Sequence, residues 1–113
     1  MTKLQAHLWI HGWSAVHFIT AAATAQSPDG GLLALTAETI TAVGALSKAC
    51  GATWSKAFIQ SFVKQQFANR TGVEIARQTA GKFPVYGNVF NGATSAVITE
   101  AILWETYAMC NAA

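Results

Sequence analysis

Apolar side chains recur along this chain at intervals of three and four residues, a spacing typical of α-helices and not of alternating strands. The first segment with this spacing covers residues 3–25 and stops at a turn over residues 27–31, which holds a proline and two glycines. The second, Leu32–Cys50, is followed by Gly51, and we expect this glycine to end the helix in the left-handed conformation. The expected inward face of the second helix consists of Leu33, Leu35, Ile40, Val43 and Leu46.

The second half of the chain predicts three more helices. Thr53 is the expected N-cap of the first, which carries an apolar stripe opposite a polar one. The apolar stripe consists of Phe58, Ile59, Phe62, Val63 and Phe67, and the polar one of Lys56, Gln60 and Lys64. Residues 71–74 match a capping box, so a short helix is expected from there to Gly81. A turn over residues 83–88 then precedes a long final helix from Val89 to about Met109.

No stretch of the chain alternates between apolar and polar residues in the way that a half-buried strand does. The pattern therefore predicts an all-α fold, a compact bundle of about five helices with a long final helix. We expect a single helical domain over residues 1–113, because no linker or change in composition divides the chain.

Charged residues make up only 11% of the chain and apolar residues 52%, whereas soluble domains carry about 25% charged residues. Much of the surface must then be neutral or apolar, and such a surface usually meets other copies of the protein or a membrane. The seven Lys and Arg residues are scattered without a basic run, so we expect no nucleic acid partner.

Candidate catalytic and metal-binding chemistry is sparse. His7 and His11 are four residues apart, as two ligands of one metal ion can be, but His17 lies elsewhere on the helix and no carboxylate is near them in sequence. We expect surface or packing histidines and no metal site. No nucleophile elbow or phosphate loop occurs, so we expect no catalytic residues, no cofactor and no enzymatic activity.

The two cysteines, Cys50 and Cys110, are too few for a disulfide scaffold and lack the spacing of a zinc or redox motif. We expect two free thiols at helix ends, which fits a reducing compartment. The expected location is the cytoplasm, with the inner membrane as the alternative.

Polar and small residues share the final helix and indicate close contact with another helix. Gly92 and Ala96 are four apart and leave a groove on one face, while Asn91 and Glu100 near it would need partners if buried. Asn88 is the expected cap of this helix. The residues that we select for an interface or for polar packing are Trp13, Asn88, Asn91, Gly92, Ala96, Glu100 and Trp104. The helix in the groove can come from a second copy or from the same chain.

Residues 4–25 and 83–98 avoid formal charge for about the length of a membrane span or a little less. Both stretches hold polar residues that are costly in lipid. A membrane-associated helical hairpin, with the Phe58 stripe at the interface, is therefore the alternative to self-assembly.

Several short motifs also resemble a known family. They are the segments 10–15 and 27–29, Gly51, the segment 83–88, Asn91 and the pair Thr99 and Glu100. With these motifs the chain is similar to the YcjF-type helical domain of unknown function, which often follows a small GTP-binding domain in bacteria and also occurs alone. The family has glycine where this chain has Val85 and Leu103.

This resemblance implies a helical-hairpin bundle, frequently membrane-associated, with no catalytic residues to carry over. No GTP-binding domain is present in this sequence. The expected function is a non-enzymatic helical protein that interacts with copies of itself and forms homo-oligomers.

Overall fold

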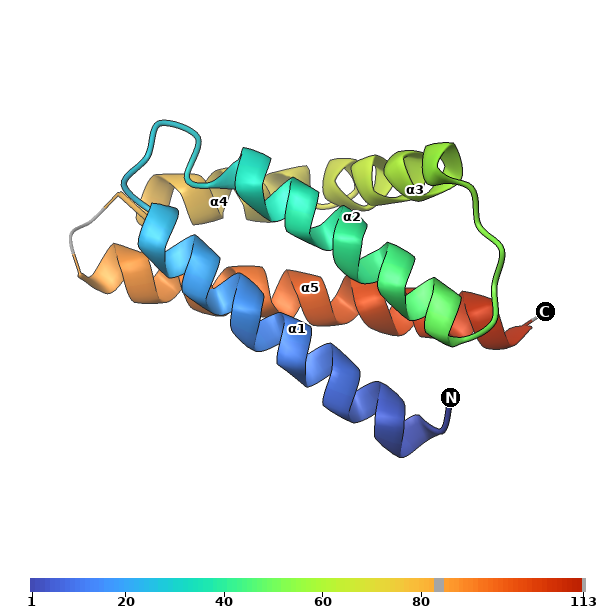
Figure 1. Cartoon of the computed structure of the whole chain (residues 1–113). Coiled ribbons are helices and arrows are strands. Elements are labelled where there is room, and N and C mark those ends of the chain that lie inside the picture. The colour runs from blue at the N-terminus through green and yellow to red at the C-terminus, as the bar shows by residue number, and fades with distance from the viewer. Residues whose placement is uncertain (83–84, 113) are drawn as a thin grey trace.

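A computed structural model of the chain describes residues 1–82 and 85–112. Its helices are α1 (Lys3–Thr24), α2 (Leu32–Ala49), α3 (Lys56–Ala68), α4 (Thr71–Ala80) and α5 (Tyr86–Ala112), as Figure 1 shows. No strand occurs in this part of the chain, so the predicted all-α fold with a long final helix is confirmed. The radius of gyration, 13.9 Å, is close to the roughly 13 Å expected of a compact chain of this length.

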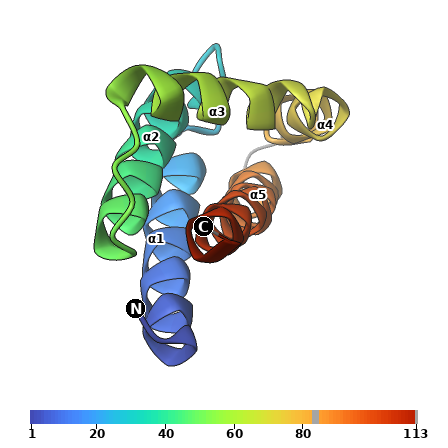
Figure 2. The same cartoon turned by 90° about the vertical axis from the view of Figure 1, so that its right-hand side faces the viewer.

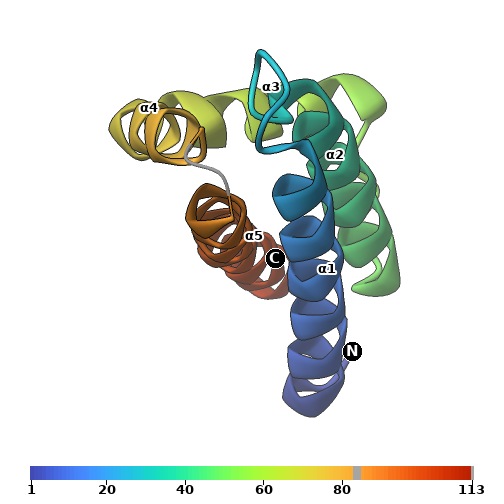
Figure 3. The ribbon, with the colours of Figure 1, turned by 90° about the vertical axis from the view of Figure 1, so that its left-hand side faces the viewer.

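The three long helices α1, α2 and α5 form a group in which each contacts the other two, and α1 makes its most extensive contacts with α5. The shorter helices α3 and α4 lie across one side of this group, α3 over α2 and α4 over α5 (Figures 2 and 3). The N-terminal half of α1 projects away from α3 and α4 (Figure 3). One side of α1 is therefore left without a covering helix.

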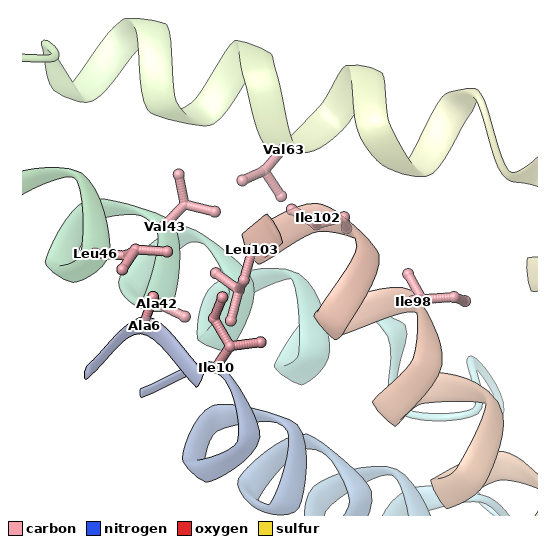
Figure 4. Packing of buried hydrophobic residues seen from close by; sticks show 9 residues of the cluster. All are labelled: Ala6, Ile10, Ala42, Val43, Leu46, Val63, Ile98, Ile102 and Leu103. Carbon is pink, nitrogen blue, oxygen red and sulfur yellow. The ribbon is translucent and has the colours of Figure 1, made fainter. Parts of the chain in front are cut away.

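The apolar core lies where α1, α2, α3 and α5 meet (Figure 4). Its buried members are Ala6, Ile10, Ala42, Val43, Leu46, Val63, Ile98, Ile102 and Leu103. Burial of each large aliphatic side chain stabilises the fold by about 1.5–3 kcal/mol. α4 contributes none of these residues, and the buried residues described in α4 are Glu74 and Arg77.

The end of α2 follows the prediction made from Gly51. Gly51 has a φ of 85°, and its amide donates to the carbonyl oxygen of Lys48 at 3.0 Å. The amide of Ala52 donates to the carbonyl oxygen of Ser47 at 2.9 Å, which completes a Schellman motif. A side chain at position 51 would be strained, because left-handed backbone brings Cβ close to the following carbonyl oxygen.

The predicted starts of α3 and α5 were wrong by two or three residues, whereas α4 begins at Thr71 as predicted but lacks the predicted cap. α3 begins at Lys56, because Ser55 rather than Thr53 is the N-cap and its hydroxyl accepts from the amide of Phe58 at 3.1 Å. α4 has no capping box: Thr71 lies inside the helix, and its hydroxyl donates to the carbonyl oxygen of Ala68 at 2.7 Å.

The last helix, α5, begins at Tyr86 and not at Val89, so Asn88 is a helical residue rather than a cap. The expected turn over residues 83–88 lies partly outside the described residues, and its described C-terminal part belongs to the helix. In α2, Leu33 was wrongly assigned to the inward face, since it is 79% exposed. Leu35, Val43 and Leu46 are buried as predicted, and Ile40 is partly buried against the core.

Candidate interaction surface

α1 turns several of its large apolar side chains toward solvent. Leu4, Leu8 and Ile19 are 71%, 68% and 67% exposed, and Trp9 and Val16 are exposed as well. The buried residues of this helix are mostly smaller or polar: Ala6, Ile10, Ser14, His17 and Ala21. We call the exposed set Leu4, Leu8, Trp9, Val16 and Ile19 the outer face of α1. No Lys, Arg, Asp or Glu lies between Lys3 and Asp29, so this face carries no formal charge.

A shallow groove of about 400 Å³, largely open to solvent, lies within the outer face. Its lining residues are Leu8, Trp9, Gly12, Trp13 and Val16. Gly12 opens the groove because it has no side chain, and a Cβ added there would meet no atom within 4 Å. Trp13, one of the residues selected from the sequence, also packs against the apolar core, so one wall of the groove is held firmly in place.

The small-residue groove of α5 is filled by α1 of the same chain. A Cβ added to Gly92 would lie 3.0 Å from the carbonyl oxygen of Phe18 and 3.1 Å from its ring. At Ala96, the backbone carbonyl accepts a hydrogen bond from the Ser14 hydroxyl at 3.3 Å. Of the two alternatives left open for this groove, the structure supports the helix from the same chain.

Glu100 and Trp104 hold the N-terminal half of α1 to α5. His11 Nδ1 lies 2.7 Å from Glu100 Oε1, and the ring of His7 meets Trp104 edge-on with centroids 4.5 Å apart. The His11 side chain is 60% exposed, so its pairing with Glu100 is worth less than about 1 kcal/mol.

Across the described residues, no group of three or more His, Cys, Asp or Glu side chains could hold a metal ion.

His17 is a buried packing residue between α1 and α2. Its Nδ1 lies 2.8 Å from the carbonyl oxygen of Trp13, and its Nε2 lies 3.0 Å from the Thr39 hydroxyl. Because the carbonyl can only accept, Nδ1 carries a proton. Burial lowers the pKa of His17 below its usual value of 6.5, although the Trp13 carbonyl and the charge of Glu38 act in the opposite direction.

Asn91 belongs to a buried polar cluster that sequence analysis did not foresee, centred on the fully buried Arg77. Arg77 Nε and Nη2 donate to the two carboxylate oxygens of Glu74 at 3.1 and 2.8 Å. Its Nη1 donates to Asn91 Oδ1 at 2.6 Å and to the carbonyl oxygen of Gly30 at 2.7 Å. Asn91 Nδ2 in turn donates to the carbonyl oxygen of Ala21 at 2.5 Å. We call Glu74, Arg77 and Asn91 the Arg77 cluster.

The Arg77 cluster joins α4 and α5 to the end of α1 and the turn that follows it through hydrogen bonds to Ala21 and Gly30. Asn88 adds to this connection, since its Nδ2 donates to the carbonyl oxygen of Ala22 at 2.8 Å and its Oδ1 accepts from Gln26 at 3.0 Å. The polar atoms point at protein partners, so this arrangement is a structural link between helices. Only the i, i+3 spacing of Glu74 and Arg77 could have indicated it from the sequence.

Comparisons with known proteins do not assign a function to the outer face of α1. No protein-family model matches the chain, and no curated protein or solved structure matches it. The resemblance to the YcjF-type domain therefore stays a prediction.

Proposed function

We propose that this protein is a non-enzymatic helical module that assembles with copies of itself through the outer face of α1. The observation that carries the proposal is the exposure of Leu4, Leu8 and Ile19 on a helix with no formal charge after Lys3. Monomeric soluble proteins rarely expose an extended apolar patch of this kind, because leaving it in water forfeits about 25 cal/mol for each Å².

The occupant that fits this face best is a second copy. Two outer faces can meet about a two-fold axis, so that an apolar side chain of each copy enters the groove beside Gly12 of the other. Neither copy brings a charge to the contact, so no ion loses its hydration. The groove wall formed by Trp13 supplies the rigid aromatic surface that protein interfaces favour.

A membrane is the second candidate, because α2 is long and apolar enough to cross one by length and composition alone. The core helix of a soluble protein passes the same test, and α2 contributes Ala42, Val43 and Leu46 to the core. The apolar stripe of α3 is also engaged within the protein, since Phe62 and Phe67 pack against the core. The outer face of α1 lacks the Lys and Arg residues that attract an interfacial helix to anionic lipid.

The test is size-exclusion chromatography with light scattering on protein prepared without detergent. We expect the wild-type protein to have the molar mass of a discrete oligomer, and Leu8→Glu and Ile19→Glu to reduce it to that of the monomer with helicity unchanged. Leu33→Glu is the matched control, because Leu33 is an even more exposed leucine and lies on α2.

A wild-type protein that is monomeric at every concentration, or equal dissociation by Leu33→Glu, would refute the proposal. Recovery of the wild-type protein only from the membrane fraction, with flotation on liposomes that Leu8→Glu abolishes, would support the membrane instead.

A further inference from the structure

The two cysteines, 60 positions apart in sequence, come together at one end of the bundle. Cys50 is the C-cap residue of α2, and Cys110 lies in the last part of α5, where the two helix ends run beside each other (Figure 1). α2 and α5 are in contact, and Cys50 lies close enough to Cys110 to act on the ionisation of its thiol. Both residues are half-buried, so each thiol remains within reach of a small molecule.

We propose that Cys50 and Cys110 are a reversible modification site that closes to an intramolecular disulfide by exchange with a small-molecule disulfide such as glutathione disulfide. The observation is independent of the outer face of α1, because neither cysteine belongs to that face. A pair of this kind is favoured over disulfides between molecules, because contact within the chain gives each thiol a high effective concentration of the other.

The exchange takes place in two steps that balance. One thiol loses its proton and attacks glutathione disulfide, which forms a mixed disulfide and releases one glutathione thiolate. The other thiol loses its proton and attacks the protein sulfur of the mixed disulfide, which forms the Cys50–Cys110 bond and releases a second glutathione. Both cysteine sulfurs are oxidised, and glutathione disulfide is reduced to two molecules of glutathione.

The environment of the two thiols indicates which one reacts first. Burial, and then the proximity of Cys50, raise the pKa of Cys110 to about 11, so its thiol stays protonated at neutral pH and is a poor nucleophile. The first attack is therefore expected from Cys50.

The resulting bond ties the end of α5 to the end of α2 and closes a long loop that holds α3, α4 and most of α5. A cross-link over a loop of this length removes conformational freedom mainly from the unfolded chain. We expect the closed form to unfold at a temperature higher by roughly 10 °C than the reduced form.

The test uses the whole protein, equilibrated in buffers of reduced and oxidised glutathione. Free thiols are then blocked with N-ethylmaleimide, and the intact mass of the protein is measured. The wild-type protein should lose two hydrogen atoms, take up no maleimide and migrate as a monomer on a gel without reductant. Its unfolding temperature should exceed that of the dithiothreitol-treated sample. The controls are Cys50→Ser and Cys110→Ser, and each should stop at one glutathione adduct without the gain in unfolding temperature.

Uptake of two glutathione groups by the wild-type protein, disulfide-linked dimers as the main product, or a closed form less stable than the reduced form would overturn the proposal. Repeating the measurement on Leu8→Glu separates this proposal from the self-assembly of α1. The disulfide should form equally well in that variant whether or not the wild-type protein is an oligomer.

Discussion

The strongest prediction about stability concerns the Arg77 cluster, and the perturbation is Arg77→Met. Methionine retains the unbranched apolar part of the side chain and removes the guanidinium group. The substitution takes away the hydrogen bonds to both oxygens of Glu74, to Asn91 Oδ1 and to the carbonyl oxygen of Gly30. It leaves the Glu74 carboxylate, whose side chain is only 10% exposed, without the two hydrogen bonds and the positive charge of Arg77.

The expected loss follows from this burial. Removing one member of a buried ion pair costs about 3–5 kcal/mol, because the remaining charge has lost both its hydration and its counter-ion. The total stability of a domain is about 5–15 kcal/mol, so Arg77→Met should remove a large part of it. The pair formed by His11 and Glu100 is the matched control, since its N to O distance of 2.7 Å is nearly the same as the 2.8 Å between Arg77 and Glu74. Because His11 is exposed, His11→Ala should cost less than about 1 kcal/mol.

Urea denaturation followed by circular dichroism measures both free energies of unfolding. The double variant Arg77→Met/Glu74→Met removes both charges together, so it should recover part of the stability lost in Arg77→Met. A cost of less than about 1 kcal/mol for Arg77→Met would show that the cluster is not closed in solution, and the reasoning from burial would be wrong. A double variant less stable than Arg77→Met would refute the assignment of the loss to the remaining carboxylate.

Two further outcomes are expected. Burial lowers the pKa of His17 below 6.5, so the unfolded chain binds a proton at this position more readily than the folded chain. The stability that neutral His17 contributes is complete above about pH 6.5 and is lost as the pH falls through the folded pKa. Unfolding temperatures measured against pH should show this dependence in the wild-type protein and a weaker one in His17→Gln. Ala96→Leu should cost about 1–3 kcal/mol in urea denaturation without changing the molar mass, because Ala96 packs on α1 of the same chain, whereas Ala101→Leu on the exposed side should change stability by less than about 0.5 kcal/mol.

Helical periodicity and glycine placement were sufficient to predict the elements. Each predicted helix is found among the described residues within a few residues of its expected position, and Gly51 ends α2 through the conformation that only glycine adopts without strain. Helix starts were harder, since both Thr53 and Ser55 can cap a helix, and Ser55 is the residue whose hydroxyl accepts from the amide of Phe58.

The polar contacts could not be predicted from the sequence, because each depends on which helices become neighbours. Asn91 was identified as a residue needing a partner if buried, but its partner Arg77 belongs to a different helix and was counted only among the scattered Lys and Arg residues. In the same way, Cys50 and Cys110 were expected at helix ends, and nothing in their spacing indicates that those two ends meet.

The side of α1 that faces the core could not be predicted from the spacing of its apolar residues. The observed orientation supports assembly through the outer face of α1. Apolar residues lie all around this helix, so its hydrophobic pattern alone does not determine the side that faces the core. Close packing determines it instead, because Ala6, Ser14 and Ala21 allow neighbouring helices to approach and bulky residues would hold them apart. Leu8 and Ile19 are consequently left outside, where they contribute little to the stability of the monomer. Their exchange for glutamate should therefore leave folding intact and affect only what the outer face of α1 binds.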